Sequence, residues 1–273
     1  MKILAGIVLY NPDPQRLVEN ISAIKEQVDC VAVFDNGGGE AAIACKNEVV
    51  VLSEGGKNIG IASALNKLCE YALDNGYDWV LTLDQDSVCP DNIISEYRKH
   101  IGDDEKLALL CPRVNDRNIG MEQEENLLDT QYVEFCITSA SLVNVDVWQK
   151  MGGGSFMDDL FIDLVDFDYC WTVLEHGYKI LQVNSVVLYH ELGHSRKVKL
   201  FGKEEAVFNH PPIRSYYMSR SNVIVGRKHK RLNQCMRWQA KRTLLINLYE
   251  RNRWAKDKMI IKGLIDGIRY KFK

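Results

Sequence analysis

The chain has 273 residues, of which 46% are hydrophobic and 26% are charged. This length suffices for one large domain with a substantial core, or for a domain with an appendage. The opening stretch MKILAGIVLYNPDP turns polar too early for a secretory signal peptide, and no apolar run approaches the ~18 residues that span a bilayer. We therefore expect a cytoplasmic protein that is either soluble or held peripherally at a membrane.

Charge is distributed unevenly along the chain, although the formal net charge is only −3. Residues 227–273 carry 15 Lys and Arg against three acids, a local charge of +12, whereas the preceding residues carry 19 against 34, or −15. A basic segment on an acidic body favours contact with phosphate or anionic lipid. A solvated helical face explains the same composition equally well.

The eight cysteines are widely scattered and form no CxxC pair. Several of them lie inside apolar segments. This pattern indicates reduced thiols in cores rather than a disulfide framework or a zinc cluster.

Strand and helix patterns alternate over the first 112 residues. Nearly continuous apolar runs predict strands at 3–9, 29–36, 48–53, 77–84 and 107–112. Capping residues and helical spacing predict a helix that begins at Pro14 behind Asp13, a helix at 59–74 behind Asn58, and a helix at 90–100.

After residue 112 the pattern is looser. It predicts an exposed acidic loop at 115–130, strand character at 132–144, a helix that begins near Asp163, and a strand at 181–194 that leads into a His-rich loop. The last sixty or so residues favour helices with apolar faces.

Apolar strands that alternate with helices indicate an α/β fold with a mostly parallel central sheet covered on both faces. Ligands of such sheets bind beyond the carboxyl ends of the strands. Three of these ends carry polar groups, namely Tyr10-Asn11, Asp35-Asn36 and Asp84-Gln85-Asp86. We therefore expect the site at this edge.

The pair Asp84 and Asp86 is the first candidate for chemistry. In an extended segment, residues two apart point to the same side, so both carboxylates would face one ligand. Two carboxylates suit a hard divalent cation that keeps positions open for phosphate. Taken alone, the pair is more commonly explained by an ordinary polar turn. Gln85 would point to the other side, where a structural role is expected.

A second acidic group follows at Asp163, Asp166 and Asp168. Asp163 and Asp166 lie three apart and would share a helical face. A carboxylate in the first helical turn is favoured by the helix dipole, and one aimed into a cleft could serve as a general base. His190, at the end of a predicted strand, could donate a nitrogen to the same metal, although a lone histidine is more often structural.

Basic residues gather in RSYYMSRSNVIVGRKHK at 214–230. Arginine forks at Arg214 and Arg220 suit diphosphate recognition, and an amphipathic helix with ordinary basic residues is the alternative. The acidic body argues against nucleic acid as a partner. The chain contains no GxxxxGK[ST] motif, and no GxGxxG follows the first strand, which weakens the kinase and dehydrogenase interpretations.

Together these stretches resemble the inverting glycosyltransferase family 2, whose fold is the Rossmann-like GT-A fold, and within it the bacterial rhamnosyltransferases. The matching stretches, in the family's order, are VLYNP, VFDNG, NIGIASALN, WVLTLDQDS, ITSASLVN, FIDLVDFDYCWTVLEHGYKI, LYHELG and RSYYMSRSN. The resemblance covers about residues 1–225, which we expect to form the GT-A domain. Residues 226–273 would be a basic, amphipathic helical C-terminal region.

The resemblance implies a role for each matching residue. Tyr10, Asp35, Asn36 and Asn58 would bind the nucleobase and ribose, and Asp84, Gln85 and Asp86 form the DxD segment that binds the nucleotide-sugar through Mg²⁺ or Mn²⁺. Asp86 would be the direct metal ligand, Asp84 would face the ribose as much as the ion, and His190 would complete the metal site. Asp166 would be the base, preceded by Val165 where the family usually has Glu, and Arg214 and Arg220 would steady the leaving diphosphate.

The implied activity is an inverting, metal-dependent transfer of L-rhamnose from dTDP-β-L-rhamnose. The acceptor would be a saccharide or a lipid-linked saccharide of a bacterial surface polysaccharide, and residues 227–273 could contact the cytoplasmic face of the inner membrane. A donor such as UDP-glucose or UDP-galactose is the nearest alternative. A catalytically inactive nucleotide-sugar-binding protein and a nucleotidyltransferase are further alternatives. The three aspartates Asp84, Asp86 and Asp166 argue against an inactive binding protein. The sequence YNPDPQRL after the first strand argues against a nucleotidyltransferase.

Overall fold

The computed structural model describes residues 1–37, 39–44, 48–116, 128–152, 156–190 and 196–272. The chain divides into two compact units, which we call unit 1 (Met1–Phe161 and Val165–His190) and unit 2 (Ile162–Leu164 and Glu191–Lys273). The boundary of a compact unit need not coincide with that of a catalytic domain. The predicted domain boundary after residue 225 therefore stays a prediction.

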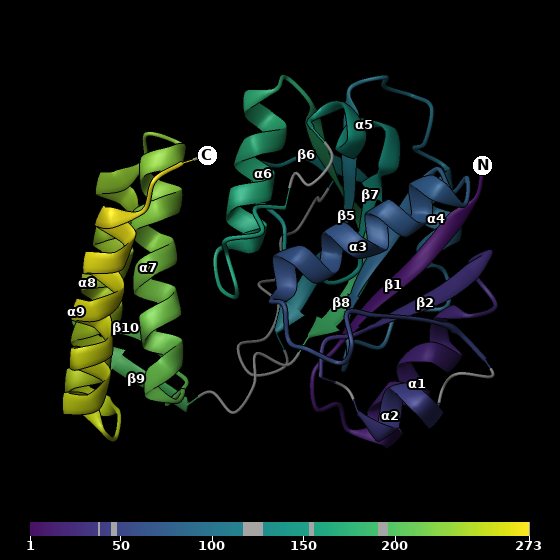
Figure 1. The fold of residues 1–273 in the computed structure, drawn as a ribbon. Helices are drawn as coiled ribbons and strands as arrows, with labels where there is room; N and C mark the ends of the chain where they lie inside the picture. Colours follow the sequence, from purple (N-terminus) through teal and green to yellow (C-terminus); the bar gives the residue numbers. More distant parts are fainter. Residues whose placement is uncertain (38, 45–47, 117–127, 153–155, 191–195, 273) are drawn as a thin grey trace. The chain divides into compact units, whose positions relative to one another are not determined.

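Unit 1 is built on one central sheet of eight strands (Figure 1). Across the sheet the order is β3-β2-β1-β4-β7-β5-β8-β6. The strands are β1 (Ile3–Leu9), β2 (Cys30–Asp35), β3 (Val50–Ser53), β4 (Trp79–Asp84), β5 (Leu107–Asp116), β6 (Thr130–Tyr132), β7 (Ser141–Asn144) and β8 (Lys179–His190). Strands β1 to β4 pair in parallel, β8 is parallel to β5, and β6 and β7 run against their neighbours. The prediction of a mostly parallel α/β sheet is confirmed.

Helices cover both faces of this sheet. They are α1 (Pro14–Ile24), α2 (Glu40–Ala44), α3 (Ile61–Asp74), α4 (Ile93–Arg98), α5 (Val145–Lys150) and α6 (Val165–Glu175). Because successive strand residues face opposite sides, Ile3 and Ile7 of β1 share a buried cluster with residues of α1 and α4. Gly6, on the other face, lies so close to Leu68 of α3 that an added Cβ would be 3.0 Å from the leucine side chain.

The first helix forms where its capping residues predict. The Asp13 carboxylate accepts hydrogen bonds from the backbone N–H groups of Gln15 and Arg16, and Pro14 is the first helical residue. The apolar face that contains Leu17, Ile21 and Ile24 is buried, as its spacing predicts.

Other predicted boundaries shift. The helix expected at 59–74 begins at Ile61 with Gly60 as its N-cap, so Asn58 is not the cap. The strand expected at 132–144 is divided into β6 and β7, because residues 133–140 leave the ladder. The helix expected near Asp163 begins at Val165. Most of the predicted acidic loop at 115–130 lies outside the described residues.

Unit 2 combines a short hairpin with three helices. The hairpin, which the sequence did not predict, pairs β9 (Arg196–Leu200) with β10 (Lys203–Val207). The helices are α7 (Pro212–Lys228), α8 (Leu232–Tyr249) and α9 (Arg253–Arg269), and they confirm the prediction of a helical C-terminal region. Figure 1 shows α7 and α9 side by side over most of their length. Among the described residues, no helix is long and apolar enough to cross a membrane.

Two glycines let α9 lie against α7. An added Cβ at Gly263 would collide with the carbonyl oxygen of Tyr216, and one at Gly267 would lie 2.7 Å from Val223 Cβ and 2.9 Å from the Arg220 carbonyl oxygen. The backbones of the two helices therefore approach each other at the Gly263-x-x-x-Gly267 spacing.

Gly267→Ala should destabilise the protein by about 1–3 kcal/mol, the usual cost of inserting a methyl group into a packed contact. Helix propensity alone predicts the opposite sign, since alanine in a helix is favoured over glycine by up to about 1 kcal/mol. Urea unfolding followed by circular dichroism measures the difference. A variant more stable than the parent would show that α7 and α9 are not held this close.

Candidate functional site

The predicted polar residues gather where the direction of strand connection reverses. From β1 the chain continues to β2 and β3 on one side and then crosses to β4 on the other side of β1. In register, Leu9 of β1 lies beside Asp35, and Val8 lies beside Asp84. Tyr10, Asp35 and Asp84 therefore lie at adjacent strand ends, at the point where open α/β sheets bind ligands.

Gln85 joins two of these strand ends. Its Oε1 accepts a hydrogen bond of 2.7 Å from the backbone N–H of Tyr10, and its Nε2 donates to the Tyr10 carbonyl oxygen at 3.1 Å. Both polar atoms of the amide are thereby used on the backbone of one residue, while the ring of Tyr10 remains exposed. A contribution of Gln85 to nucleotide-sugar binding stays a prediction.

Buried polar side chains that sequence reasoning missed hold the turn after β4. Asn20 of α1 is fully buried and donates a 2.7 Å hydrogen bond to the carbonyl oxygen of Asp84. Ser139 and Ser87 are buried, and the Ser139 hydroxyl donates to that of Ser87 at 2.7 Å and accepts from the backbone N–H of Asp84 at 3.3 Å. The buried contact of Asn20 could have been predicted from the sequence, because this polar residue lies on the apolar face of a predicted helix.

The segment before α3 is ordered by two asparagines. Asn36 is 4% exposed and its Oδ1 accepts from the backbone N–H of Ile59 at 2.7 Å. Asn58 is exposed and its Oδ1 accepts from the N–H of Gly60 at 3.0 Å. Nearby, the Asp35 carboxylate accepts from the N–H of Gly37 at 3.1 Å. Asn36 thus positions the chain, and the nucleoside contacts of Asp35 and Asn58 stay predictions.

Asp84 and Asp166 line two hollows of unit 1 that share wall residues. Asp84 lines one with Val8, Ile61, Leu65, Thr82, Leu83 and Thr138. Asp166 lines the other with Thr82, Leu109, Cys136, Ile137, Thr138, Ser141, Val143, Phe156, Tyr169 and Cys170. Since Thr82 and Thr138 belong to both walls, the two carboxylates lie on adjoining hollows.

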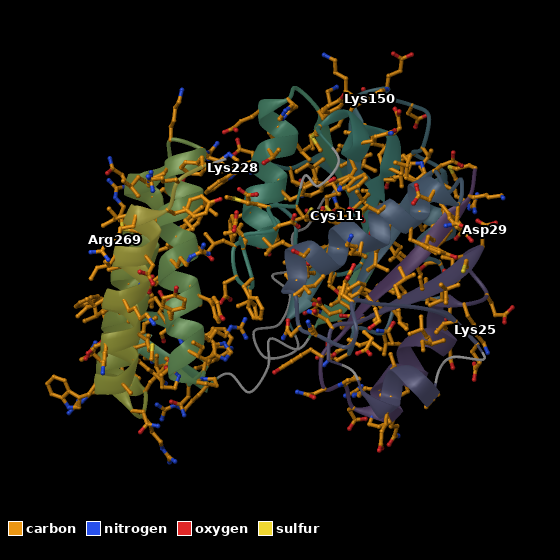
Figure 2. The ribbon with its side chains drawn as sticks, viewed as in Figure 1. Lys25, Asp29, Cys111, Lys150, Lys228 and Arg269 are labelled. Atoms are coloured by element: carbon orange, nitrogen blue, oxygen red, sulfur yellow. The ribbon has the colours of Figure 1, made fainter. Side chains whose placement is uncertain are left out.

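Two thiols, those of Cys136 and Cys170, line the hollow of Asp166. Cys136 Sγ lies 3.8 Å from Cys170 Sγ. Hydrogen bonds from Cys111, Cys170 and Ser141 hold the pKa of Cys136 well below its usual value. The cysteines of the described residues are all free, as the scattered spacing predicts. Figure 2 labels Cys111 among the strands of the sheet.

Asp166 is the second residue of α6, and an unusual turn precedes it. Asp163 and Leu164 both have positive φ, 66° and 59°, which is uncommon for residues with a Cβ and marks a constrained backbone. Asp163 therefore does not share a helical face with Asp166, which corrects that expectation. Its carboxylate pairs instead with Arg214, whose Nη2 donates at 3.0 Å and whose Nε lies 3.3 Å and 3.4 Å from its oxygens.

The two arginines predicted to steady a diphosphate have protein partners in unit 2. Arg214 is held by Asp163. The guanidinium of Arg220 lies 5.4 Å from the centre of the Tyr270 ring, which is a cation–π distance. Their role toward a diphosphate stays a prediction.

The described residues contain no group of three or more His, Cys, Asp and Glu that could hold a metal ion. They do offer the carboxylates of Asp84, half-buried, and Asp86, exposed, on one short turn. Two hard oxygen donors fit Mg²⁺ or Mn²⁺ when phosphate oxygens and water supply the other positions. The backbone of His190 ends β8, but its side chain lies outside the described ones, so its metal role stays a prediction.

Comparison with known proteins identifies a matching family model, a related protein and solved structures of the same fold. A model of the family described as glycosyl transferase family 2 matches residues 5–151. The dTDP-rhamnosyl transferase RfbF of Shigella flexneri is 29% identical over an alignment of 292 residues that covers 98% of this chain and 95% of the relative.

Solved structures with the same fold include S. aureus TarS 1-349 in complex with UDP-GlcNAc, with a TM-score of 0.61, 14% identity, and coverage of 98% of this chain and 81% of that one. Another is the mannosyltransferase PcManGT from Pyrobaculum calidifontis in complex with GDP-Man and Mn²⁺, with a TM-score of 0.58, 13% identity, and coverage of 100% and 76%. At these identities the likeness concerns the fold, and it confirms the expected GT-A architecture.

Proposed function

The chain belongs to glycosyltransferase family 2, and from that premise we propose that it transfers L-rhamnose from dTDP-β-L-rhamnose to a saccharide acceptor with inversion at the anomeric carbon. The donor is inferred from the sequence similarity to dTDP-rhamnosyl transferase RfbF, which extends over nearly the whole of both chains. A relation of this extent includes the segments that follow the matched family region, such as α6 and α7.

The proposed chemistry is a single displacement. Asp166 takes the proton from the acceptor hydroxyl, whose oxygen then attacks the anomeric carbon from the face opposite the departing diphosphate. A carboxylate within reach of the hydroxyl can do this as a general base. We propose that the donor lies on the Asp84 side and the acceptor on the Asp166 side; the two carboxylates line hollows that share Thr82 and Thr138.

Departure of the nucleoside diphosphate concentrates negative charge at the strand ends. We propose that Asp84 and Asp86 hold a divalent cation, Mg²⁺ or Mn²⁺, which when bound neutralises diphosphate charge. Tyr10, Asp35, Asn36 and Asn58 are proposed to order the nucleoside around the end of β2. Arg214 and Arg220 are proposed to steady the leaving diphosphate; Arg214 already donates from its Nε and Nη2 to Asp163.

The proposed acceptor is a saccharide or lipid-linked saccharide of a bacterial surface polysaccharide. We propose that it is reached at the cytoplasmic face of the inner membrane, and the charge of +12 over residues 227–273 supports a peripheral contact there. Each Lys or Arg near an anionic surface contributes about 1 kcal/mol to such a contact.

A donor screen tests the function. The protein is incubated with dTDP-rhamnose, UDP-glucose, UDP-galactose or GDP-mannose, in Mn²⁺ or Mg²⁺, with a panel of octyl glycosides as acceptors, and nucleoside diphosphate release is followed. We expect release and a glycosylated product with dTDP-rhamnose alone. Turnover with a UDP-sugar instead would overturn the donor assignment. Donor binding without turnover on any acceptor would favour an inactive nucleotide-sugar-binding protein.

A further inference from the structure

Helix α9 carries apolar side chains on two opposite faces. Its inner face packs on α7 through Gly263 and Gly267. Four large apolar residues nevertheless remain exposed on the other side, namely Trp254 (81%), Ile261 (58%), Ile265 (42%) and Ile268 (66%). Their spacings of seven, four and three residues place them on one stripe of the helix, which we call the α9 stripe. Exposed apolar side chains aligned in this way indicate an interaction surface.

The charges beside the α9 stripe all have the same sign. The exposed charged side chains of α9 are Arg253, Lys258, Lys262 and Arg269, and the Lys262 ammonium lies 5.4 Å from the centre of the Tyr216 ring of α7. Figure 2 shows Arg269 on the side of α9 that faces away from α7.

The acidic side chains of α9 are turned toward the neighbouring helices. Asp257 accepts a 2.9 Å hydrogen bond from Asn247 Nδ2 of α8, and Asp266 accepts one of 2.9 Å from the Tyr216 hydroxyl of α7. The outward surface of α9 is therefore an apolar stripe with a basic border.

One lysine of α9 does not contribute to this border. Lys256 is 2% exposed and its Nζ lies 2.6 Å from Glu250 Oε2, within a buried pair. Burial opposes the charge of Glu250, but the hydrogen bond from Lys256 and the charge of Arg242 outweigh it and keep the pKa of Glu250 below its usual value. Lys256 thus anchors α9 inward, which leaves the α9 stripe facing outward.

We propose that the α9 stripe inserts among the headgroups of an anionic lipid bilayer, with α9 lying in the plane of the membrane. This inference rests on the proposed peripheral contact of residues 227–273 and assigns that contact to a surface. A helix with one apolar and one basic face binds in this way, since the apolar face is buried at the acyl boundary while Lys and Arg meet lipid phosphates. Trp254, whose indole is amphipathic, suits the interfacial region.

A second copy of the chain fits this surface less well. A two-fold contact pairs the same patch on both subunits. It would therefore bring Lys258, Lys262 and Arg269 of one copy toward the same residues of the other, and like charges at short distance repel. An anionic lipid surface covers the apolar stripe and neutralises its border together.

The test is flotation of the full chain with vesicles of phosphatidylglycerol and phosphatidylethanolamine in equal parts, compared with phosphatidylcholine vesicles. The triple variant Ile261→Ser, Ile265→Ser, Ile268→Ser should bind the anionic vesicles about 100-fold less well, because three apolar side chains no longer insert. Lys258→Glu with Lys262→Glu should weaken binding about tenfold or more. Val18→Ser, which changes an exposed aliphatic residue of α1, is the matched control and should bind as the parent does.

Fluorescence gives a second readout. Trp254 emission should shift to the blue on vesicle binding, and the shift should be absent from Trp254→Phe. One contrary outcome is that the triple variant binds the vesicles as tightly as the parent, with added salt dissociating both proteins from the vesicles. That result would show that the contact is purely electrostatic and that the α9 stripe is not inserted. Dimers in light scattering that the triple variant disperses would assign the stripe to a second copy and overturn the proposal, as would no vesicle binding. The donor screen uses soluble acceptors, so it succeeds or fails independently.

Discussion

Asp166→Asn is expected to lower kcat of sugar transfer by about 10³-fold while leaving donor binding nearly unchanged. The amide keeps the size and shape of the carboxylate but cannot accept the acceptor proton, and removal of a positioned general base typically costs 10²–10⁴-fold. Asp166 lines its hollow at the first turn of α6, where the backbone N–H of Phe167 lies 2.9 Å from its Oδ1. An amide oxygen can accept the same hydrogen bond, so the turn should remain intact.

The measurement is nucleoside diphosphate release under saturating donor, with donor affinity from calorimetry. The matched control is Glu175→Gln, which removes a carboxylate from the exposed last residue of the same helix and should leave kcat within about twofold of the parent. Turnover of Asp166→Asn at the parental rate would refute the base assignment. A loss of donor affinity instead of kcat would move Asp166 from the acceptor to the donor side of the mechanism.

The parts of the fold that were predictable are those where local signals and burial agree. Strand β1 is a continuous apolar run that is buried over its whole length, and its predicted range is the observed one. Helix α1 begins at Pro14 because Asp13 caps it, and both signals lie in adjacent residues. The gathering of Tyr10, Asp35 and Asp84 at adjacent strand ends followed from the parallel topology, which the alternation of strands and helices predicts.

The errors arose where partners distant in sequence decide the local structure. The sequence ITSASLVN has strand character throughout, yet the backbone N–H of Ser141 bonds back to the carbonyl oxygen of Thr138 and closes a turn before β7. This turn is held by β4, because the Ser139 hydroxyl accepts from the N–H of Asp84 and the N–H of Ala140 donates to the carbonyl oxygen of Thr82. Asn58 is of a residue type that often caps helices. The carbonyl oxygen of Phe161 instead accepts from the N–H of Ile61, and the helix begins there.

The arginine assignments show the same limit for the site. A fork suited to diphosphate is equally suited to a carboxylate, and no local pattern around Arg214 reveals that Asp163, 51 residues earlier, is its partner. Asn20 is the opposite case, since its place on an apolar helix face could have indicated a buried polar contact.

Asp86→Asn is expected to lower transfer about 10²-fold or more at low Mn²⁺ and to raise the Mn²⁺ concentration needed for half-maximal rate. Loss of one charged group that stabilises the developing negative charge of a transition state typically costs 10²–10³-fold. Asp86 is exposed at the end of the turn after β4, so the change should not disturb folding. The exposed Asp91→Asn, in the same connection but beyond the turn, is the matched control and should behave as the parent.

Asp84→Asn separates the two carboxylates of the pair. Asp84 is half-buried, its backbone is held by Asn20 and Ser139, and its residue lines the hollow formed with Val8, Thr82 and Thr138. If it faces the ribose as well as the ion, its variant should raise the donor KM even at saturating Mn²⁺, whereas high Mn²⁺ should rescue Asp86→Asn in part. Binding of dTDP with and without Mn²⁺, followed by calorimetry, distinguishes the two. If both variants respond equally to Mn²⁺, the two aspartates act as equivalent metal ligands. If the transfer rate after chelation does not depend on added Mn²⁺ or Mg²⁺, the mechanism does not use a cation.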